Sequence, residues 1–173
     1  MKVDSVKKLK SGDIDSFEEV YDKFSQKIYQ FVFFKVNNKD KAEDICSEVF
    51  LRFVKFVKEG NKIDSISGVL YRIARNLIID DSRKNKEDLV GDENLGSIKD
   101  DDFDIDDKYI NNENLFSALS DLSDDYRDVI VMSYIDEMNI RDVADVFGKT
   151  VGATKTMLSR AMDKMREILK TKN

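Results

Sequence analysis

The chain has 173 residues, of which 41% are hydrophobic and 37% are charged, with seven glycines and no proline. This composition disfavours turn-rich β-sandwiches and barrels and suits long helices. Histidine is absent and cysteine occurs once, which excludes serine–histidine catalysis, imidazole-bound metals and intramolecular disulfides. No apolar run approaches the ~20 residues that span a bilayer, and no apolar signal core follows the N-terminus. The sequence therefore predicts a soluble, cytoplasmic protein without membrane insertion.

The net charge of −6 is unevenly distributed along the chain. Residues 1–86 carry a net charge of +4 and residues 115–173 a net charge of −1, whereas residues 87–114 carry −9. This acidic middle stretch has no helical or strand period, so it is predicted to be a flexible linker between two helical domains. An acidic chain with a mildly basic first part can still present a basic face to DNA.

The first domain is predicted to form three helices, because its apolar residues recur at three- and four-residue steps. A capping signal at Asp15 or Ser16 begins the first helix. Its apolar face consists of Phe17, Val20, Tyr21, Phe24, Ile28, Phe31 and Val32. The second helix begins near Asp40 and stops at Gly60, and the third covers about residues 65–86. Cys46 lies on the apolar side of the second helix, where we expect a buried, unreactive thiol.

Two polar faces of this domain are candidate binding surfaces. The third helix carries a stripe roughly opposite its apolar side, formed by Arg72, Arg75, Asn76, Ile79 and Arg83. Arginine and asparagine side chains can hold phosphates and a base edge. The second helix has an acidic face with Glu43, Asp44, Ser47 and Glu48, followed by Arg52. Each face is either a binding surface or simply solvated, and periodicity does not distinguish the two.

The C-terminal part contains a helix-turn-helix pattern. A short amphipathic helix with Ile140, Val143, Ala144 and Phe147 ends at Gly148, which can adopt the left-handed conformation. The next helix is predicted to bury Thr154, Leu158, Ala161 and Met165. Its other side would then offer hydrogen-bonding groups to the major groove: Lys155, Thr156, Ser159 and Arg160. The alternative is a simple helical hairpin with a solvated face.

Several segments together resemble the extracytoplasmic-function (ECF) sigma factors of the sigma-70 family. Residues 40–52, from Asp-Lys-Ala-Glu-Asp to Phe-Leu-Arg, look like the segment that binds core polymerase. Residues 69–83, with Leu-Tyr-Arg-Ile-Ala-Arg-Asn, resemble the −10 element segment. Residues 118–122, 126–131 and 143–166 resemble the domain that reads the −35 element. The resemblance covers nearly the whole chain except the linker, in the expected order.

The resemblance implies an all-α protein with two small helical domains. Residues 1–86 would be a region 2-like domain for polymerase binding, −10 recognition and melting, and residues 115–173 a region 4-like helix-turn-helix domain for −35 recognition. Residues 87–114 would be the flexible acidic linker between them. Such a protein has no catalytic chemistry of its own, so no catalytic residue, metal or cofactor is expected. The implied partners are core RNA polymerase, through the clamp helices of its largest subunit, promoter DNA and an anti-sigma factor, which family members commonly have.

The resemblance also implies which side chains make these contacts. Core polymerase would be bound by Glu43, Asp44, Ser47, Glu48, Phe50 and Leu51. The melted −10 strand, with one base flipped at the loop before the third helix, would be held by Asn61, Lys62, Asp64, Arg72, Arg75, Asn76 and Arg83. The −35 duplex would be read by Lys149, Thr150, Gly152, Lys155, Thr156, Ser159 and Arg160.

The sequence departs from the family pattern at two places. Val69 stands where a tryptophan commonly precedes the Leu-Tyr-Arg run, so packing under the −10 surface differs. Residues 152–156 read Gly-Ala-Thr-Lys-Thr where Gly-Thr-Val-Lys-Ser is common. If Thr154 is buried, its hydroxyl needs a backbone acceptor.

Other functional classes account for less of the sequence. A polymerase-independent helix-turn-helix regulator that binds operators would not need the polymerase-binding or −10 segments. A pure protein-interaction module would need no DNA-reading helix. The aspartates at 100–102 could suggest a metal-dependent hydrolase, but they lie in an aperiodic segment without a framework for ligand geometry. The linker itself is either a plain tether or a nucleic-acid mimic that occupies the channel for nascent RNA.

Overall fold

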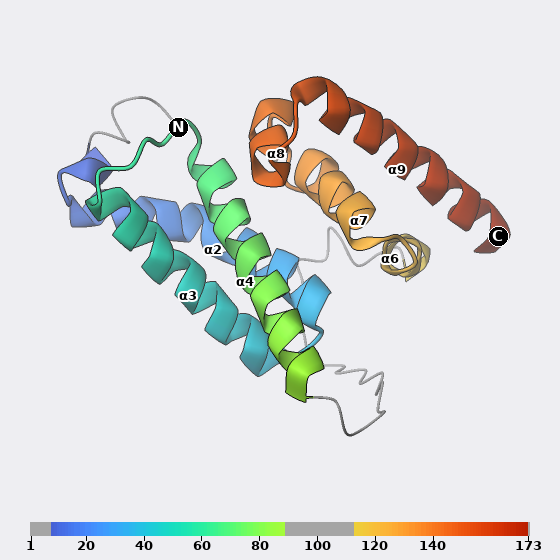
Figure 1. Cartoon of the computed structure of the whole chain (residues 1–173), viewed down its shortest axis with the longest axis horizontal. Helices are drawn as coiled ribbons and strands as arrows, with labels where there is room; N and C mark the ends of the chain where they lie inside the picture. Colours follow the sequence, from blue (N-terminus) through green and yellow to red (C-terminus); the bar gives the residue numbers. More distant parts are fainter. Residues whose placement is uncertain (1–7, 89–112, 173) are drawn as a thin grey trace. The chain divides into compact units, whose positions relative to one another are not determined.

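The computed structural model describes residues 8–88 and 113–172. The chain divides into two compact units, unit 1 at Met1–Lys99 and unit 2 at Asp100–Asn173. In the described residues all regular secondary structure is helical, which confirms the predicted all-α class (Figure 1). Most of the predicted linker lies outside the described residues. Its first two and last two residues belong to the end of α4 and the start of α6.

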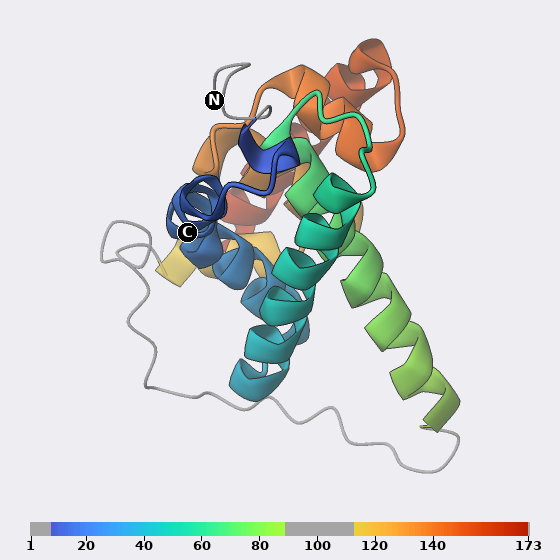
Figure 2. The same cartoon turned by 90° about the vertical axis from the view of Figure 1, so that its left-hand side faces the viewer.

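Unit 1 is built on three helices that all contact one another: α2 (Ile14–Val36), α3 (Lys39–Lys58) and α4 (Ile66–Asp88). Figure 2 shows α3 and α4 joined by a short loop and diverging away from it. The core between the helices is apolar and fully enclosed, and includes Val20, Ile28, Val32, Val49, Phe53, Leu70, Tyr71 and Ala74. Helices α3 and α4 each bury one side in this core, and side chains on the other side of each helix are exposed.

Two details of unit 1 differ from the sequence prediction. The N-cap of helix α2 is Asp13, two residues before the earlier of the two predicted caps, and the hydroxyl of Ser16 donates to Asp13 Oδ2 at 2.5 Å. The predicted capping residues are therefore inside the helix, and the first turn is closed by a side-chain pair instead. Tyr21 is 53% exposed, so its assignment to the apolar core face is wrong. It lies at the edge of that face, where its ring packs on that of Phe50 in α3.

Unit 2 comprises α6 (Glu113–Ser120), α7 (Asp124–Ile130), a π-helical turn η1 (Val131–Ile135), α8 (Ile140–Phe147) and α9 (Val151–Lys172). Helix α9 contacts α6, α7 and α8, so the smaller helices pack along one long helix (Figure 1). The core of unit 2 contains Leu119, Leu122, Val129, Met132, Val143, Ala144, Ala161 and Met165. The predicted burial of Thr154, Ala161 and Met165 is confirmed, while Leu158 is half-buried.

Arg127 ties α7 to the end of α6. Its Nε donates to the carbonyl of Leu119 at 2.9 Å, and one terminal nitrogen donates to those of Ser120 and Leu122 at 2.9 and 3.1 Å. These carbonyls belong to the last turn of a helix and to the residues after it, where intrahelical donors run out. A single guanidinium on α7 therefore caps the C-terminal end of α6.

Candidate polymerase and nucleic-acid interfaces

The outer side of α3 forms a continuous surface of acidic and apolar side chains. We call it the docking surface: Glu43, Asp44, Ser47, Glu48, Phe50 and Leu51. Opposite it, α3 buries Ala42, Ile45, Cys46, Val49, Phe53 and Val57, so the helix separates its two faces cleanly. Leu51 is 66% exposed, and Glu48 accepts an ion pair from Arg52 Nε at 2.6 Å. The result is an exposed leucine next to carboxylates.

Tyr21 extends the docking surface onto α2, and the sequence analysis missed it. Its ring packs on that of Phe50, with centroids 4.9 Å apart and planes tilted by 58°. Aromatic pairs of this kind hold each other in place beyond the area that they bury. The only sequence signal was its position at the margin of the apolar stripe of α2, which favoured a core assignment. The contact makes Tyr21 part of an interface between two helices that faces solvent.

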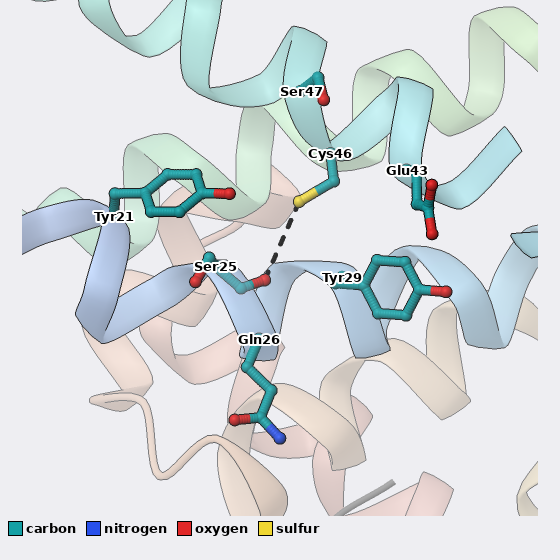
Figure 3. Close-up of a pocket in the computed structure, with 7 residues that line it drawn as sticks. All are labelled: Tyr21, Ser25, Gln26, Tyr29, Glu43, Cys46 and Ser47. Atoms are coloured by element: carbon teal, nitrogen blue, oxygen red, sulfur yellow. Dashed lines mark hydrogen bonds between the residues drawn. The ribbon is translucent and has the colours of Figure 1, made fainter. Parts of the chain in front are cut away.

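A groove of about 420 Å³ lies between α2 and α3, beside the docking surface. Figure 3 shows its lining side chains: Tyr21, Ser25, Gln26, Tyr29, Glu43, Cys46 and Ser47. The Cys46 thiol donates weakly to the Ser25 carbonyl at 3.9 Å. Burial raises the pKa of Cys46 to about 11, so the thiol stays protonated near neutral pH. The expected buried thiol is confirmed by these contacts.

The loop between α3 and α4 has one anchored side and one open side. Gly60 follows α3 with φ 77°, which confirms that it ends the helix. Asn61 is half-buried, and its amide donates to the Phe56 carbonyl at 3.0 Å. Ile63 is buried, whereas Lys62 and Asp64 are exposed and form an ion pair at 2.9 Å. The hydrogen bond from Lys62 to Asp64, together with the negative charge of Asp64, raises the pKa of Lys62. We call residues 60–64 the strand loop.

The polar stripe on α4 begins next to the strand loop. Arg72 and Asn76 are exposed and Arg75 is half-buried. The guanidinium of Arg72 lies over the Phe56 ring, 5.9 Å from its centroid. Phe56 thus contacts Arg72 through its ring and Asn61 through its carbonyl, which brings two predicted −10 residues to one place. We call Arg72, Arg75 and Asn76 together with the strand loop the strand surface.

Arg83 is placed apart from the other predicted −10 residues. It lies eleven residues beyond Arg72 on α4, which corresponds to about 16 Å along a helix axis. It is exposed and lines a second groove, of about 440 Å³, with α3 side chains that include Asp44 and Glu48. Arg83 therefore lies beside residues of the docking surface, whereas Arg72 lies in the first third of α4 and Asn76 near its middle.

The helix-turn-helix prediction matches the geometry of α8 and α9. The Asn139 side chain caps α8 by accepting from the Arg141 amide at 3.0 Å. Gly148 ends α8 with φ 60°, and the next amide, from Lys149, donates back to the Ala144 carbonyl at 3.0 Å. This pattern closes a helix through a left-handed residue. The Thr150 hydroxyl then caps α9 by accepting from the Ala153 amide at 3.2 Å.

The outer side of the turn and of the first part of α9 is open to solvent. We call it the recognition surface: Lys149, Thr150, Gly152, Lys155, Thr156, Ser159 and Arg160, all of which are exposed. A Cβ added at Gly152 would meet nothing within 4 Å, so the fold itself does not require glycine there. The Thr156 hydroxyl donates to the Gly152 carbonyl at 3.1 Å. The lysines and Arg160 are therefore the long cationic side chains that this surface projects.

In the described part of the chain, no group of three or more Cys, Asp or Glu side chains is arranged to hold a metal ion. Over the same residues, no helix combines the length and the apolarity needed to cross a membrane.

Comparison with known proteins assigns both units to one family. The family model "Sigma-70 region 2" matches residues 20–88, and "Sigma-70, region 4" matches residues 112–165. The chain is 33% identical to the ECF RNA polymerase sigma factor SigW of Bacillus subtilis (strain 168), over 95% of each chain. The matched region 2 segment contains the docking and strand surfaces, and the region 4 segment contains the recognition surface.

Solved structures share the same fold. The chain resembles CnrH, solved in complex with the cytosolic domain of CnrY, with a TM-score of 0.70 at 17% identity over 98% of this chain and 97% of that one. It also resembles the sigma factor RpoE of Bartonella quintana, solved with the anti-sigma factor NepR, with a TM-score of 0.66 at 22% identity over 91% and 98%. With its two sigma-70 regions in order and its near full-length match to SigW, the chain belongs to the ECF sigma factors of the sigma-70 family.

Proposed function

We propose that this ECF sigma factor binds core RNA polymerase and directs transcription initiation at a specific set of promoters. The observation that carries the proposal is the similarity to SigW, which extends over both units. The residues of the docking, strand and recognition surfaces would then follow one another along the chain in the order that the family uses. The factor makes and breaks no covalent bond in this scheme, because RNA synthesis belongs to the polymerase.

The docking surface would bind the clamp helices of the largest polymerase subunit. Leu51 offers an exposed apolar side chain, and the Tyr21–Phe50 pair gives it a rigid aromatic border. The carboxylates of Glu43, Asp44 and Glu48 would pair with basic side chains and speed encounter. A partner helix with an apolar stripe flanked by arginine or lysine fits this combination, and Arg83 would meet it at one end.

The strand surface would hold the melted −10 strand. Arg72 stands beside the strand loop, where a cation can bind phosphate and stack on a base. Asn76 lies one helical turn further along α4 and is exposed, so its amide can meet a base edge. The Asn61 amide is already bonded to Phe56, which suggests that it shapes the loop while Lys62 and Asp64 face the strand.

The recognition surface would read the −35 duplex from the major groove. Lys155 and Arg160 lie five residues apart on the exposed side of α9, within the part of the helix that a helix-turn-helix domain inserts. The amides at the start of α9, near Gly152, would bind a backbone phosphate. Lys155 or Arg160 would then read the hydrogen-bond acceptors on the edges of one or two base pairs.

One further partner follows from the family resemblance. RpoE of Bartonella quintana was solved with an anti-sigma factor, and we propose a partner of this class for the present chain.

The acidic linker, which lies almost entirely outside the described residues, would act as a nucleic-acid mimic in the RNA channel. Replacing Asp100, Asp101, Asp102, Asp106 and Asp107 by asparagine would weaken holoenzyme assembly or change early RNA synthesis at low salt if it is a mimic, and neither if it is a tether.

Transcription with purified core polymerase tests the proposal directly. Promoters are first selected by sequencing the DNA that the holoenzyme retains, and run-off RNA is then measured with and without the chain. We expect initiation only when core polymerase and the chain are both present. Tight, specific duplex binding by the free chain without any effect on polymerase would instead identify an operator-binding regulator.

A further inference from the structure

The residues that precede α2 form a closed turn. Residues 8–10 are helical, and the amides of Ser11, Gly12 and Asp13 donate back to the carbonyls of Lys8, Leu9 and Lys8 at 3.1, 3.1 and 3.2 Å. The turn ends at Gly12, whose φ of 80° reverses the chain into the N-cap of α2. Its conformation is therefore set by its own backbone bonds, and we call residues 8–12 the N-terminal turn.

Two side chains attach the N-terminal turn to the rest of unit 1. Leu9 is 1% exposed and is among the largest fully buried side chains of the protein. Next to it, Lys10 Nζ donates to the carbonyl of Gly60 at 3.3 Å, across fifty positions of sequence. Gly60 is the first residue of the strand loop, and the turn lies beside the C-terminal end of α3 from which that loop departs (Figures 1 and 2).

The strand loop is also held by its second residue, Asn61, and by Ile63. Ile63 is buried, and the Asn61 amide bonds to the Phe56 carbonyl. Gly60 has a left-handed φ and no side chain, and its amide donates to the Val57 carbonyl at 3.0 Å. Lys10 Nζ adds a bond on the carbonyl side, at the peptide that leads from Gly60 into the loop. The bond from Lys10 restrains that peptide. A loop that is ordered before binding loses less conformational entropy when it accepts a ligand.

We propose that the N-terminal turn is a brace that pre-orders the strand loop, with Leu9 as its anchor and Lys10 as a positioning residue for the −10 strand. This inference rests on the proposed function for its DNA readout. Lys10 acts through Gly60 and need not touch DNA. The turn thereby belongs to the promoter-opening machinery although it lies outside residues 20–88, which match the region 2 model.

Lys10→Met tests the positioning role, because it keeps the apolar stem and removes the donor. Lys8→Met is the matched control, since Lys8 lies in the same turn, is exposed and carries the same charge. Lys10→Arg restores a donor. We expect Lys10→Met to weaken holoenzyme binding to a pre-melted −10 bubble by about two- to fivefold, the range of one solvent-exposed hydrogen bond. Lys8→Met should change it by less than about twofold, and Lys10→Arg should recover most of the loss.

Hydrogen exchange provides a readout that does not depend on DNA. In the free full-length chain, Lys10→Met should accelerate exchange of the amides at 61–64 and leave the interior of α3 and α4 unchanged. Leu9→Ala should accelerate amide exchange in both the N-terminal turn and the strand loop. If Leu9→Ala instead destabilises α3 and α4 to the same extent, Leu9 is an ordinary core residue and the brace is refuted.

The outcomes separate the brace from the proposed function. Equal weakening by Lys8→Met and Lys10→Met would reduce the effect to lost positive charge and overturn the positioning role. Unchanged exchange at 61–64 in Lys10→Met would overturn the brace even if transcription is sigma-dependent. If the wild-type chain does not support initiation with core polymerase, the proposed function fails, while accelerated loop exchange would still establish the brace as a structural device.

Discussion

The hydroxyl of Thr154 donates a 3.0 Å hydrogen bond to the carbonyl of Thr150, one turn earlier at the start of α9. Thr154 is fully buried where α9 packs into unit 2, so its polar atom would be costly without this acceptor. The same Thr150 caps the helix through its own hydroxyl. The acceptor expected for a threonine at a position where the family commonly has valine is therefore supplied locally.

Thr154→Val should change the free energy of unfolding of unit 2 by less than about 1 kcal/mol, because a satisfied hydroxyl is exchanged for a methyl of the same shape. Thr154→Ala should cost about 1 kcal/mol or more, since it leaves a small cavity. Calorimetry of the full-length chain measures both. A large loss with Thr154→Val would mean that the hydroxyl contributes more than its local bond.

Leu51→Glu should reduce assembly with core polymerase at least tenfold, because it places another charge at the apolar centre of the docking surface. It should leave the melting temperature of the chain nearly unchanged, since Leu51 is 66% exposed. Ile14→Glu is the matched control: Ile14 is 78% exposed at the start of α2, outside the docking surface. Equal assembly by both variants in a competition assay would refute the proposed docking surface.

Lys155→Ala and Arg160→Ala should separate base reading from phosphate binding on the recognition surface. A bidentate base contact is worth about 1–3 kcal/mol and carries sequence preference, whereas a phosphate contact mainly changes the salt dependence. We expect one variant to alter the −35 preference in promoter selection and the other to lower the salt slope. Wild-type profiles in both variants would contradict the assigned orientation of α9.

Asn76→Ala should impair binding of the melted −10 strand while −35 binding stays intact, because the two surfaces lie in different units. A promoter with a pre-melted −10 bubble distinguishes gripping from opening. Incomplete rescue by pre-melting is expected if the Asn76 amide contacts the exposed strand. Full rescue would assign the residue to duplex opening instead.

The pKa of Cys46 predicts a loss of stability at high pH. Burial raises this pKa from 9.0 to about 11, so between these values the unfolded chain ionises while the folded thiol keeps its proton. The contribution of Cys46 to the free energy of unfolding is therefore unchanged below pH 9 and falls as the pH rises toward 11. Urea unfolding of the wild type and of Cys46→Ala across this range should show the steeper decline in the wild type. Parallel declines would contradict the raised pKa.

Local patterns predicted much of the fold correctly because a helix and its apolar face depend on residues only a few positions apart. The three- and four-residue spacing placed α2, α3, α4 and α9, and Gly60 and Gly148 both end helices with positive φ. The faces of α3 followed from the same period, as did the burial of Thr154 and its need for an acceptor. The assignments to polymerase came from the family resemblance, those to DNA came from this resemblance and from the polar faces of two helices, and all of them stay predictions.

The sequence by itself determined the helical class, the order of the helices and most of their buried faces, since these depend on spacing within a few turns. Only the tertiary structure decided that Tyr21 packs on Phe50, that Arg83 lines a groove with Asp44 and Glu48, that Arg127 caps α6 and that Lys10 reaches Gly60. Tyr21, Arg83 and Lys10 meet partners that are distant in the chain, and Arg127 meets a neighbouring helix across a turn. Such contacts depend on how helices pack, and no local period encodes that packing.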